Sequence, residues 1–191
     1  MGFYKQLLCH FDTWAVALSL QPLAGVLFTS GGMRLNHSKL YRTEVAVISA
    51  SSPIAEAAKL MRDYRVGSIV VIQLNSDGSF SPIGLLTDRD IVTELVAEEI
   101  DLKTVLVADI MSPDPITVRH TAQLDEMVKI MRQYNVRRLP VVDERRHLVG
   151  FVSFDDLLER VGFELSSLSQ ISQGQNKFEK ELRPPRFTRP L

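Results

Sequence analysis

Two hydroxyl–carboxylate pairs with the same spacing are the residues of this chain best suited to chemistry. Thr87 precedes Asp90 by three positions, and Ser153 precedes Asp156 by the same interval. At a helix start, a hydroxyl together with the helix dipole favours a phosphate, and a carboxylate can accept hydrogen bonds from two adjacent hydroxyls. The same spacing also fits a capping box with Asp in place of the usual Glu. Spacing alone therefore leaves ligand binding and helix capping equally open.

Each pair lies in a signature of the form Gly-x-x-[Thr/Ser]-x-x-Asp, at residues 84–90 and 150–156. One apolar pattern precedes both signatures at a constant offset of 70: Ile54, Ala57, Ala58 and Met61 correspond to Leu124, Met127, Val128 and Met131. The offset falls to 66 at the signatures because the first copy has a longer polar turn near residues 75–79, where a length change is tolerated. The chain therefore contains one unit twice, which decides the architecture.

Both copies predict the same order of elements: strand, helix, strand, strand, helix. The apolar positions follow i, i+3, i+4, i+7, which is typical of a helix packed on one face. A β-branched run follows each helix, at residues 69–72 and 139–142, and is continuous enough for a buried strand. Since each unit is too small to bury its apolar face alone, we expect an α/β (α+β) fold in which the two units pack as a pair.

These features resemble the paired cystathionine-beta-synthase (CBS) domains, also called a Bateman module. The resemblance covers about residues 38–164. Besides the duplicated pattern and the two signatures, it rests on the segment 136–143 and on the lead-in Asp109-Ile110-Met111. It implies two repeats packed sheet to sheet around a pseudo-twofold axis, in a module of the stand-alone type.

The domain boundaries follow from this resemblance. We expect a loosely ordered N-terminal extension at 1–37, a first CBS repeat at 38–104 and a second at 105–164. Residues 165–191 would then form a helical extension with a basic tail. An alternative places the natural start at Met33, just before the repeats.

The resemblance also implies two clefts between the repeats that take an adenosine-containing ligand, such as AMP, ADP, ATP or S-adenosylmethionine. The aspartates of the signatures are candidates for the ribose hydroxyls, and Thr87 and Ser153 for a phosphate. Strand residues such as Ile48 and Val118 are expected to line the apolar slot for adenine. With the resemblance, ligand binding is favoured over capping in at least one cleft.

Two adjacent arginines, Arg137 and Arg138, precede a buried strand where the family often carries basic residues facing phosphates. Neighbouring side chains of a strand point to opposite faces, so at most one of them faces a given cleft. The alternative is a solvated rim in which they pair with Asp143 or Glu144.

The first repeat differs in this respect. The counterparts of the two arginines are Gly67 and Ser68, which carry no charge, so we expect the two clefts to differ in phosphate preference. Arg89, at the start of a predicted helix, is a third phosphate candidate, although an arginine in that position is more often simply exposed.

Neither catalysis nor metal binding is indicated. The four histidines are scattered, and none has a second histidine or cysteine at metal-ligand spacing. No nucleophile elbow, phosphate loop or His-Glu-x-x-His motif occurs. Asp155 and Asp156 would point about 100° apart on a helix, and not at one substrate bond. We therefore predict a protein that is not an enzyme and holds no metal.

The composition of the chain limits the classes of binding partner that it is expected to have. The chain has 191 residues, 45% hydrophobic and 24% charged, with a net charge of −1, which gives no reason to expect nucleic acid or a membrane. The apolar stretch 11–28 is interrupted by polar residues and proline, so no membrane span is predicted. The single cysteine, Cys9, excludes a disulfide within the chain and fits the cytoplasm.

The predicted function is therefore a regulatory module that binds an adenosyl ligand and signals to another protein, and the resemblance implies that two chains form a homodimer. The alternative is a ligand-independent homodimerisation or interaction scaffold, in which the signatures serve only as helix caps. A nucleic-acid-associated factor that uses the basic tail is a third and weaker reading.

Overall fold

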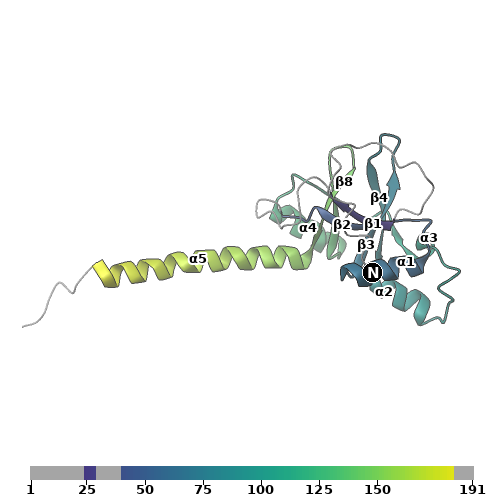
Figure 1. Ribbon diagram of the computed structural model, residues 1–191. Coiled ribbons are helices and arrows are strands. Elements are labelled where there is room, and N and C mark those ends of the chain that lie inside the picture. The colour runs from purple at the N-terminus through teal and green to yellow at the C-terminus, as the bar shows by residue number, and fades with distance from the viewer. Residues whose placement is uncertain (1–23, 29–39, 183–191) are drawn as a thin grey trace, which may run out of the picture.

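The two copies of the duplicated unit fold into two neighbouring β-sheets (Figure 1). The computed structural model describes the backbone of residues 24–28 and 40–182, and the side chains of residues 40–171. It is a mixed α/β structure, as the sequence predicts. Each sheet carries its own helices, so each repeat has a core of its own.

The first sheet has five strands in the order β1-β2-β3-β4-β5. The strands are β1 (Ala24–Phe28), β2 (Glu44–Ser49), β3 (Ser68–Leu74), β4 (Phe80–Thr87) and β5 (Ser112–Pro113). Strands β2 and β3 pair in parallel, and the other neighbours are antiparallel. The helices of this half are α1 (Ile54–Tyr64), α2 (Asp88–Ile91), its π-helical continuation η1 (Val92–Val96) and α3 (Val107–Ile110).

The second sheet has three strands in the order β6-β7-β8. The strands are β6 (Val118–Arg119), β7 (Arg138–Val142) and β8 (Leu148–Ser153), and the helices are α4 (Leu124–Tyr134) and α5 (Phe154–Leu182). Strand β6 is parallel to β7, and β8 is antiparallel to it. The predicted order of strand, helix, strand, strand, helix therefore occurs twice, from β2 to η1 and from β6 to α5.

The duplication is visible in the backbone conformation as well as in the sequence. Helices α1 and α4 both end at a residue in the left-handed conformation, Arg65 with φ 54° and Asn135 with φ 53°. These residues are separated by the same offset of 70 that relates the apolar stripes. The predicted helix, its end and the following strand are therefore in register in both copies.

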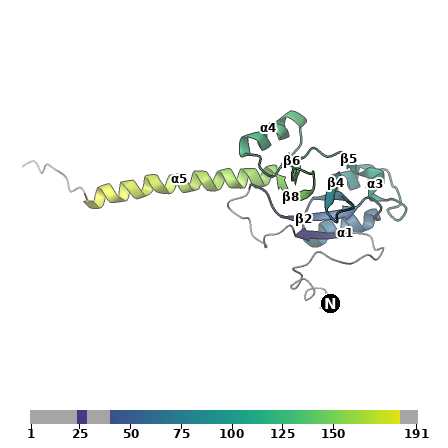
Figure 2. The same cartoon turned by 90° about the horizontal axis from the view of Figure 1, so that it is seen from above.

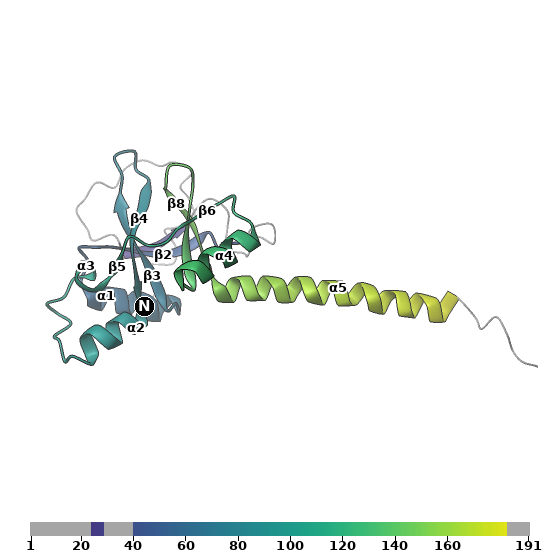
Figure 3. The ribbon, with the colours of Figure 1, turned by 180° about the vertical axis from the view of Figure 1, so that it is seen from behind.

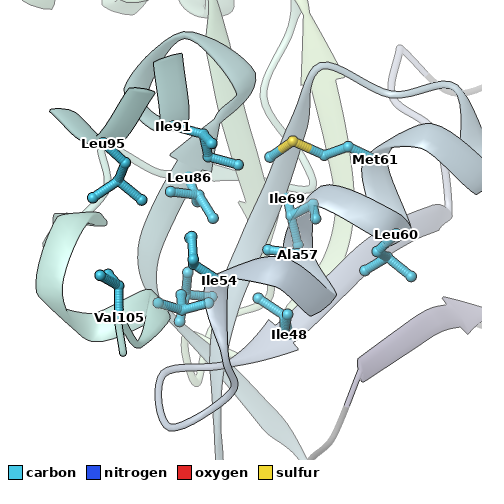
Figure 4. Packing of buried hydrophobic residues seen from close by; sticks show 12 residues of the cluster. Ile48, Ile54, Ala57, Leu60, Met61, Ile69, Leu86, Ile91, Leu95 and Val105 are labelled. Atoms are coloured by element: carbon cyan, nitrogen blue, oxygen red, sulfur yellow. The ribbon is translucent and has the colours of Figure 1, made fainter. Parts of the chain in front are cut away.

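The apolar stripe of α1 packs on one face of the first sheet, as predicted (Figure 4). Ile54, Ala57 and Met61 are buried there against Ile69 of β3 and Leu86 of β4. The equivalent core of the second repeat contains Met127, Met131, Leu139, Val141 and Val152. Burial of each large apolar side chain contributes about 1.5–3 kcal/mol, so both repeats have a core that holds helix to sheet.

The opposite face of each sheet meets the other sheet. Val45 and Val47 of β2, together with Val70 and Ile72 of β3, pack against Leu148 of β8. Figure 2, seen from above, shows β2 and β8 beside one another between the helices of the two halves. This contact is the sheet-to-sheet packing that the resemblance implied.

The two repeats also exchange their lead-in segments. Ser112 of β5 pairs with Leu85 in the first sheet, although it precedes the second repeat. Arg42 precedes the first repeat and forms an antiparallel bridge with Phe151 of β8 in the second. Arg42 and Ser112 are related by the repeat offset of 70, and Leu85 and Phe151 by the offset of 66. The exchange is therefore the same on both sides and ties the two repeats together.

The strand β1 was not predicted, since residues 1–37 were expected to form a loosely ordered extension. Residues 24–28 instead pair antiparallel with β2, from Ala24 opposite Ile48 to Phe28 opposite Glu44. The pairing covers the outer edge of β2, which would otherwise expose unpaired backbone groups. The rest of the extension, including Met33, lies outside the described residues.

Candidate functional site

A cavity of about 440 Å³ lies between the two repeats. The first repeat supplies its walls from the start of β2 at residues 44–46 and from the turn between α1 and β3 at residues 66–68. The second repeat supplies Arg138 from β7, Phe151 and Ser153 from β8, and the start of α5. The cavity therefore lies where the resemblance placed a cleft, at the junction of the repeats.

Asp156 is the buried acid of this cavity, with its side chain 7% exposed. Its Oδ2 accepts hydrogen bonds from the backbone N–H of Ser153 at 2.9 Å and from the Ser153 hydroxyl at 2.6 Å. Its Oδ1 accepts from Nε of Arg42 at 2.6 Å, and Nη2 of Arg42 lies 2.5 Å from the same oxygen. Both carboxylate oxygens are thus engaged, one by the helix start and one by the lead-in of the first repeat.

Ser153 and Asp156 also form the capping contacts of α5. The Ser153 Oγ accepts a hydrogen bond from the backbone N–H of Asp156 at 3.2 Å, which complements the bonds that Ser153 donates. The capping interpretation is therefore confirmed for this pair. It does not exclude ligand binding, because the Ser153 side chain lines the cavity and the positive end of the α5 dipole lies beside it.

Arg138, the first residue of β7, and Arg137, which precedes it, lie differently, as the alternation of strand side chains predicts. Arg138 is half-buried and lines the cavity, and its Nη2 would be 3.4 Å from a Cβ added at Gly67 of the first repeat. Arg137 is exposed, lies 3.4 Å from Asp155 and has its guanidinium carbon 5.3 Å from the centre of the Phe154 ring. The rim pairing of Arg137 is therefore with Asp155, and not with Asp143 or Glu144.

The corresponding pair of the first repeat, Thr87 and Asp90, forms a complete capping box at α2. Asp90 Oδ2 accepts from the backbone N–H and from the hydroxyl of Thr87, both at 2.8 Å. Neither residue lines the cavity, and Arg89 is exposed outside it. Within the part of the chain that the structure describes, no salt bridge reaches Asp90, because the residue equivalent to Arg42 is Ser112.

Ile48 and Val118, the expected walls of the adenine slot, lie elsewhere. Ile48 is fully buried in the core under α1, and Val118 is 3% exposed in the core of the second repeat. Both face the helices and not the space between the sheets. The part of β2 that lines the cavity is its start, at residues 44–46, so the expectation for these two side chains is wrong for this cavity.

Arg42 is the important site residue that the sequence did not reveal. It is separated from Asp156 by 114 positions, and no local pattern relates the two. A signal did exist in the repeat alignment, because Arg42 replaces the uncharged Ser112 at the equivalent position. This difference between the repeats is of the same kind as the replacement of Gly67 and Ser68 by Arg137 and Arg138, and it could have identified Arg42 as a candidate in the same way.

A second polar contact joins the repeats at the tips of their hairpins, which stand side by side in Figure 1. His147 Nε2 lies 3.6 Å from Asp77 Oδ2, and His147 Nδ1 lies 3.2 Å from Asp143 Oδ2. Burial raises the pKa of Asp143, but the amide hydrogen bonds from His147 and Arg145 and the nearby imidazole outweigh it, so its pKa is lowered. Hydrogen bonds from Ser79 lower the pKa of Asp77.

Two searches of the described residues were negative. Residues 40–171, whose side chains the structure describes, contain no group of three or more His, Cys, Asp or Glu side chains placed to hold a metal ion. No helix in the same residues is both long and apolar enough to cross a membrane.

Comparison with known proteins matches both repeats. A family model described as the CBS domain matches residues 38–97 and 107–162. An uncharacterised protein of Methanopyrus kandleri is 33% identical over 141 residues, which cover 74% of this chain and 68% of that protein. The CBS domain-containing protein YhcV of Bacillus subtilis is 35% identical over 133 residues, covering 66% of this chain and 90% of YhcV. A crystal structure of a conserved protein from Pyrococcus horikoshii has a TM-score of 0.55 and 28% identity, covering 63% of this chain and 86% of the other.

Proposed function

The chain belongs to the CBS-domain family, and on that premise we propose that it is a non-catalytic regulatory module that binds a phosphorylated adenosine ligand between its repeats. The observation that carries the proposal is the inter-repeat cavity, in which a buried carboxylate, a helix start and two arginines meet. Its volume of about 440 Å³ lies in the range of sites for small molecules. The regulated protein would be a separate partner.

Each part of an adenine nucleotide has a matching group in the cavity. The Asp156 carboxylate can accept the two hydroxyls of a ribose. Arg138 and the positive end of the α5 dipole offer positive charge to a phosphate, and the Ser153 hydroxyl can donate to it once it turns away from Asp156. Apolar wall residues of the first repeat, Val45, Ala46 and Val66, offer a surface for the base.

The ion pair of Arg42 bears on which ligand is preferred. Because Arg42 engages Oδ1 of Asp156, a ribose can use that oxygen only if the guanidinium moves away. The Arg42 side chain is 53% exposed, so it can turn without unpacking the core. A phosphate would give the displaced guanidinium a new partner, whereas adenosine would leave it unpaired. The cavity therefore favours a phosphorylated ligand such as AMP, ADP or ATP over adenosine.

This exchange of partners supplies a mechanism for signalling. Arg42 contacts the second repeat through Asp156 and through the backbone bridge to Phe151, and β2 of the first repeat begins two residues later. A ligand that changes the partner of Arg42 would bind one arrangement of the repeats more tightly and so shift its population.

The capping contacts favour a second candidate, a ligand-independent scaffold. Both aspartates of the signatures already bond to their own helix starts in the structure. In that case the cavity would be an incidental gap and the two aspartates would serve stability only.

Isothermal titration calorimetry of the full-length protein tests the proposal. AMP, ADP, ATP, adenosine and S-adenosylmethionine are titrated into the parent protein and into Asp156→Asn and Asp90→Asn. Binding of a phosphorylated nucleotide that is lost in Asp156→Asn and kept in Asp90→Asn would support the cavity as the site. If no ligand binds to the parent, and both variants only lower the melting temperature, the scaffold is the better description.

A further inference from the structure

The charges around the inter-repeat cavity are not balanced. Among the described residues that line it, two are arginines and four carry a carboxylate: Arg42 and Arg138, and Glu44, Asp155, Asp156 and Glu159. A phosphate site normally has an excess of positive charge, so these acids are either neutralised by other residues or restrict which phosphates can enter. The partners of each carboxylate distinguish the two possibilities.

Two of the four carboxylates are neutralised within the structure. Asp156 is paired with Arg42, and Asp155 lies 3.4 Å from Arg137, which does not line the cavity. Both acids also lie in the first turn of α5, where a carboxylate compensates the positive end of the helix dipole. Helix α5 starts at the body of the molecule and projects away from it (Figure 3), so only its first residues reach the cavity. These two acids therefore contribute little repulsion to an anion.

Glu44 and Glu159 are the two carboxylates of the cavity without such a partner. In the part of the chain that the structure describes, neither side chain forms a hydrogen bond or an ion pair. Glu44 is half-buried at the start of β2, two residues after Arg42, whereas Glu159 is exposed on α5. Because a partly buried charge is screened less by salt than an exposed one, Glu44 is the stronger source of negative potential.

The positive charge in the cavity is limited to its two arginines. Arg138 forms no ion pair within the described residues, but a Cβ added at Gly67 would lie 3.4 Å from its Nη2 and 3.2 Å from Oδ2 of Asp88, so this acid lies near the same guanidinium. When a ligand displaces Arg42 from Asp156, two guanidinium groups face it. They match the charge of about −1.5 to −2 that one phosphate monoester carries at neutral pH. No further cation lines the cavity among the described residues to receive a second phosphate.

We propose that Glu44, assisted by Glu159, makes the cavity selective for nucleoside monophosphates by repelling a second and a third phosphate. The inference rests on the proposed function, because it concerns the ligand of the same cavity. A protein can reject a related ligand by an unpaired charge against it, without losing contacts to the preferred one. A cleft also concentrates the potential of the charges that line it, so two unpaired carboxylates disfavour the added charge of ADP and ATP.

Isothermal titration calorimetry of the full-length protein with AMP, ADP and ATP tests this selectivity. EDTA is present in all titrations, so that no divalent cation masks the charge of the polyphosphates. The parent is expected to bind AMP at least about tenfold more tightly than ATP. Glu44→Gln preserves the size of the side chain and removes its charge, so it should reduce this ratio at least about threefold. Glu159→Gln should reduce the ratio less, because its carboxylate is exposed.

Two controls separate charge in the cavity from other causes. Glu126→Gln removes an exposed carboxylate of α4 that does not line the cavity, so it should leave the ratio unchanged. Raising the salt concentration from about 0.1 M to about 1 M shortens the Debye length from about 10 Å to about 3 Å, so the preference of the parent for AMP should weaken. Since the salt series and Glu159→Gln do not alter Glu44, they test the inference even if Glu44→Gln does not fold.

The outcomes distinguish this inference from the proposed function. Equal affinity for AMP and ATP would overturn the inference and leave nucleotide binding in place. A preference for AMP that is the same in Glu44→Gln and at high salt would mean that the cavity excludes polyphosphates by size, which also overturns it. If none of the three nucleotides binds to the parent, the proposed function itself is wrong, and the inference is wrong with it.

Discussion

Arg42 and Asp156 are joined across the two repeats by a charged hydrogen bond of 2.6 Å, although 114 residues separate them in the sequence. Both residues line the cavity between the repeats, and the same arginine bridges to β8 through its backbone. No equivalent exists for Asp90 among the described residues, since Ser112 occupies the corresponding position. One contact thus makes the two halves of a duplicated chain different.

Removing this ion pair should weaken the junction between the repeats. Arg42→Ala leaves Asp156 buried with one oxygen unpaired, and we expect the free energy of unfolding to fall by about 1–2 kcal/mol. Urea unfolding measures the change. Arg62→Ala removes an exposed pair with Asp63 and serves as the control, with an expected change within about 0.5 kcal/mol. Equal effects of the two variants would mean that the Arg42 pair contributes no more than a surface contact.

The two signature hydroxyls should have the same effect on stability but different effects on binding. Ser153→Ala and Thr87→Ala each remove a capping hydroxyl, so each should cost about 1 kcal/mol of stability. Only Ser153 lines the cavity, so only Ser153→Ala is expected to weaken nucleotide binding. Thermal unfolding and calorimetry are measured on both variants. A loss of affinity in Thr87→Ala alone would place the binding site in the first repeat.

Two equivalent glycines of the repeats should differ in their tolerance to alanine. A Cβ at Gly150 would clash with the buried Tyr41 ring and lie 2.7 Å from the backbone oxygen of Arg42. A Cβ at Gly84 would meet mainly the flexible thioether of Met111, at 2.5 Å. We expect Gly150→Ala to cost about 2–3 kcal/mol, since backbone must move, and Gly84→Ala distinctly less. Denaturant midpoints compare the two, and an equal or smaller loss for Gly150→Ala would contradict the close packing of the lead-in.

Acid should weaken the contact between the hairpin tips. The pKa values of Asp77 and Asp143 are both lowered from 3.8, so their stabilisation is complete above that value and is lost as the pH falls through the lowered values. Asp143→Asn is therefore expected to reduce the loss of stability between about pH 5 and about pH 2. Urea midpoints across this range test it, with Glu126→Gln, an exposed carboxylate of α4, as the control. The same steepness in Asp143→Asn as in the parent would show that the lowered pKa of Asp143 does not contribute to the loss of stability in acid.

The sequence determined the features that depend on contacts between residues close together in the chain, namely the two helices with apolar stripes and the capping pairs. The duplicated stripe predicted α1 and α4, because an apolar residue on every turn must face a core. The spacing of Thr87 to Asp90 and of Ser153 to Asp156 indicated the capping contacts as one of two open interpretations, because both partners lie within one helical turn. Strand alternation likewise predicted that Arg137 and Arg138 would not face the same cleft, but it did not indicate which one would face it.

Only the tertiary structure decided which side chains meet across the repeats. The pairing of β1 with β2, the exchange of the lead-in segments and the contact of Arg42 with Asp156 all join residues far apart in the sequence. Ile48 was misplaced for the same reason: its strand was clear, but which face of β2 packs under α1 and which meets the second sheet depends on the packing of both layers. Local sequence patterns specify the helices and strands. The junction between the two repeats depends instead on the side chains that each repeat does not bury in its own core, and these meet only when both repeats have folded.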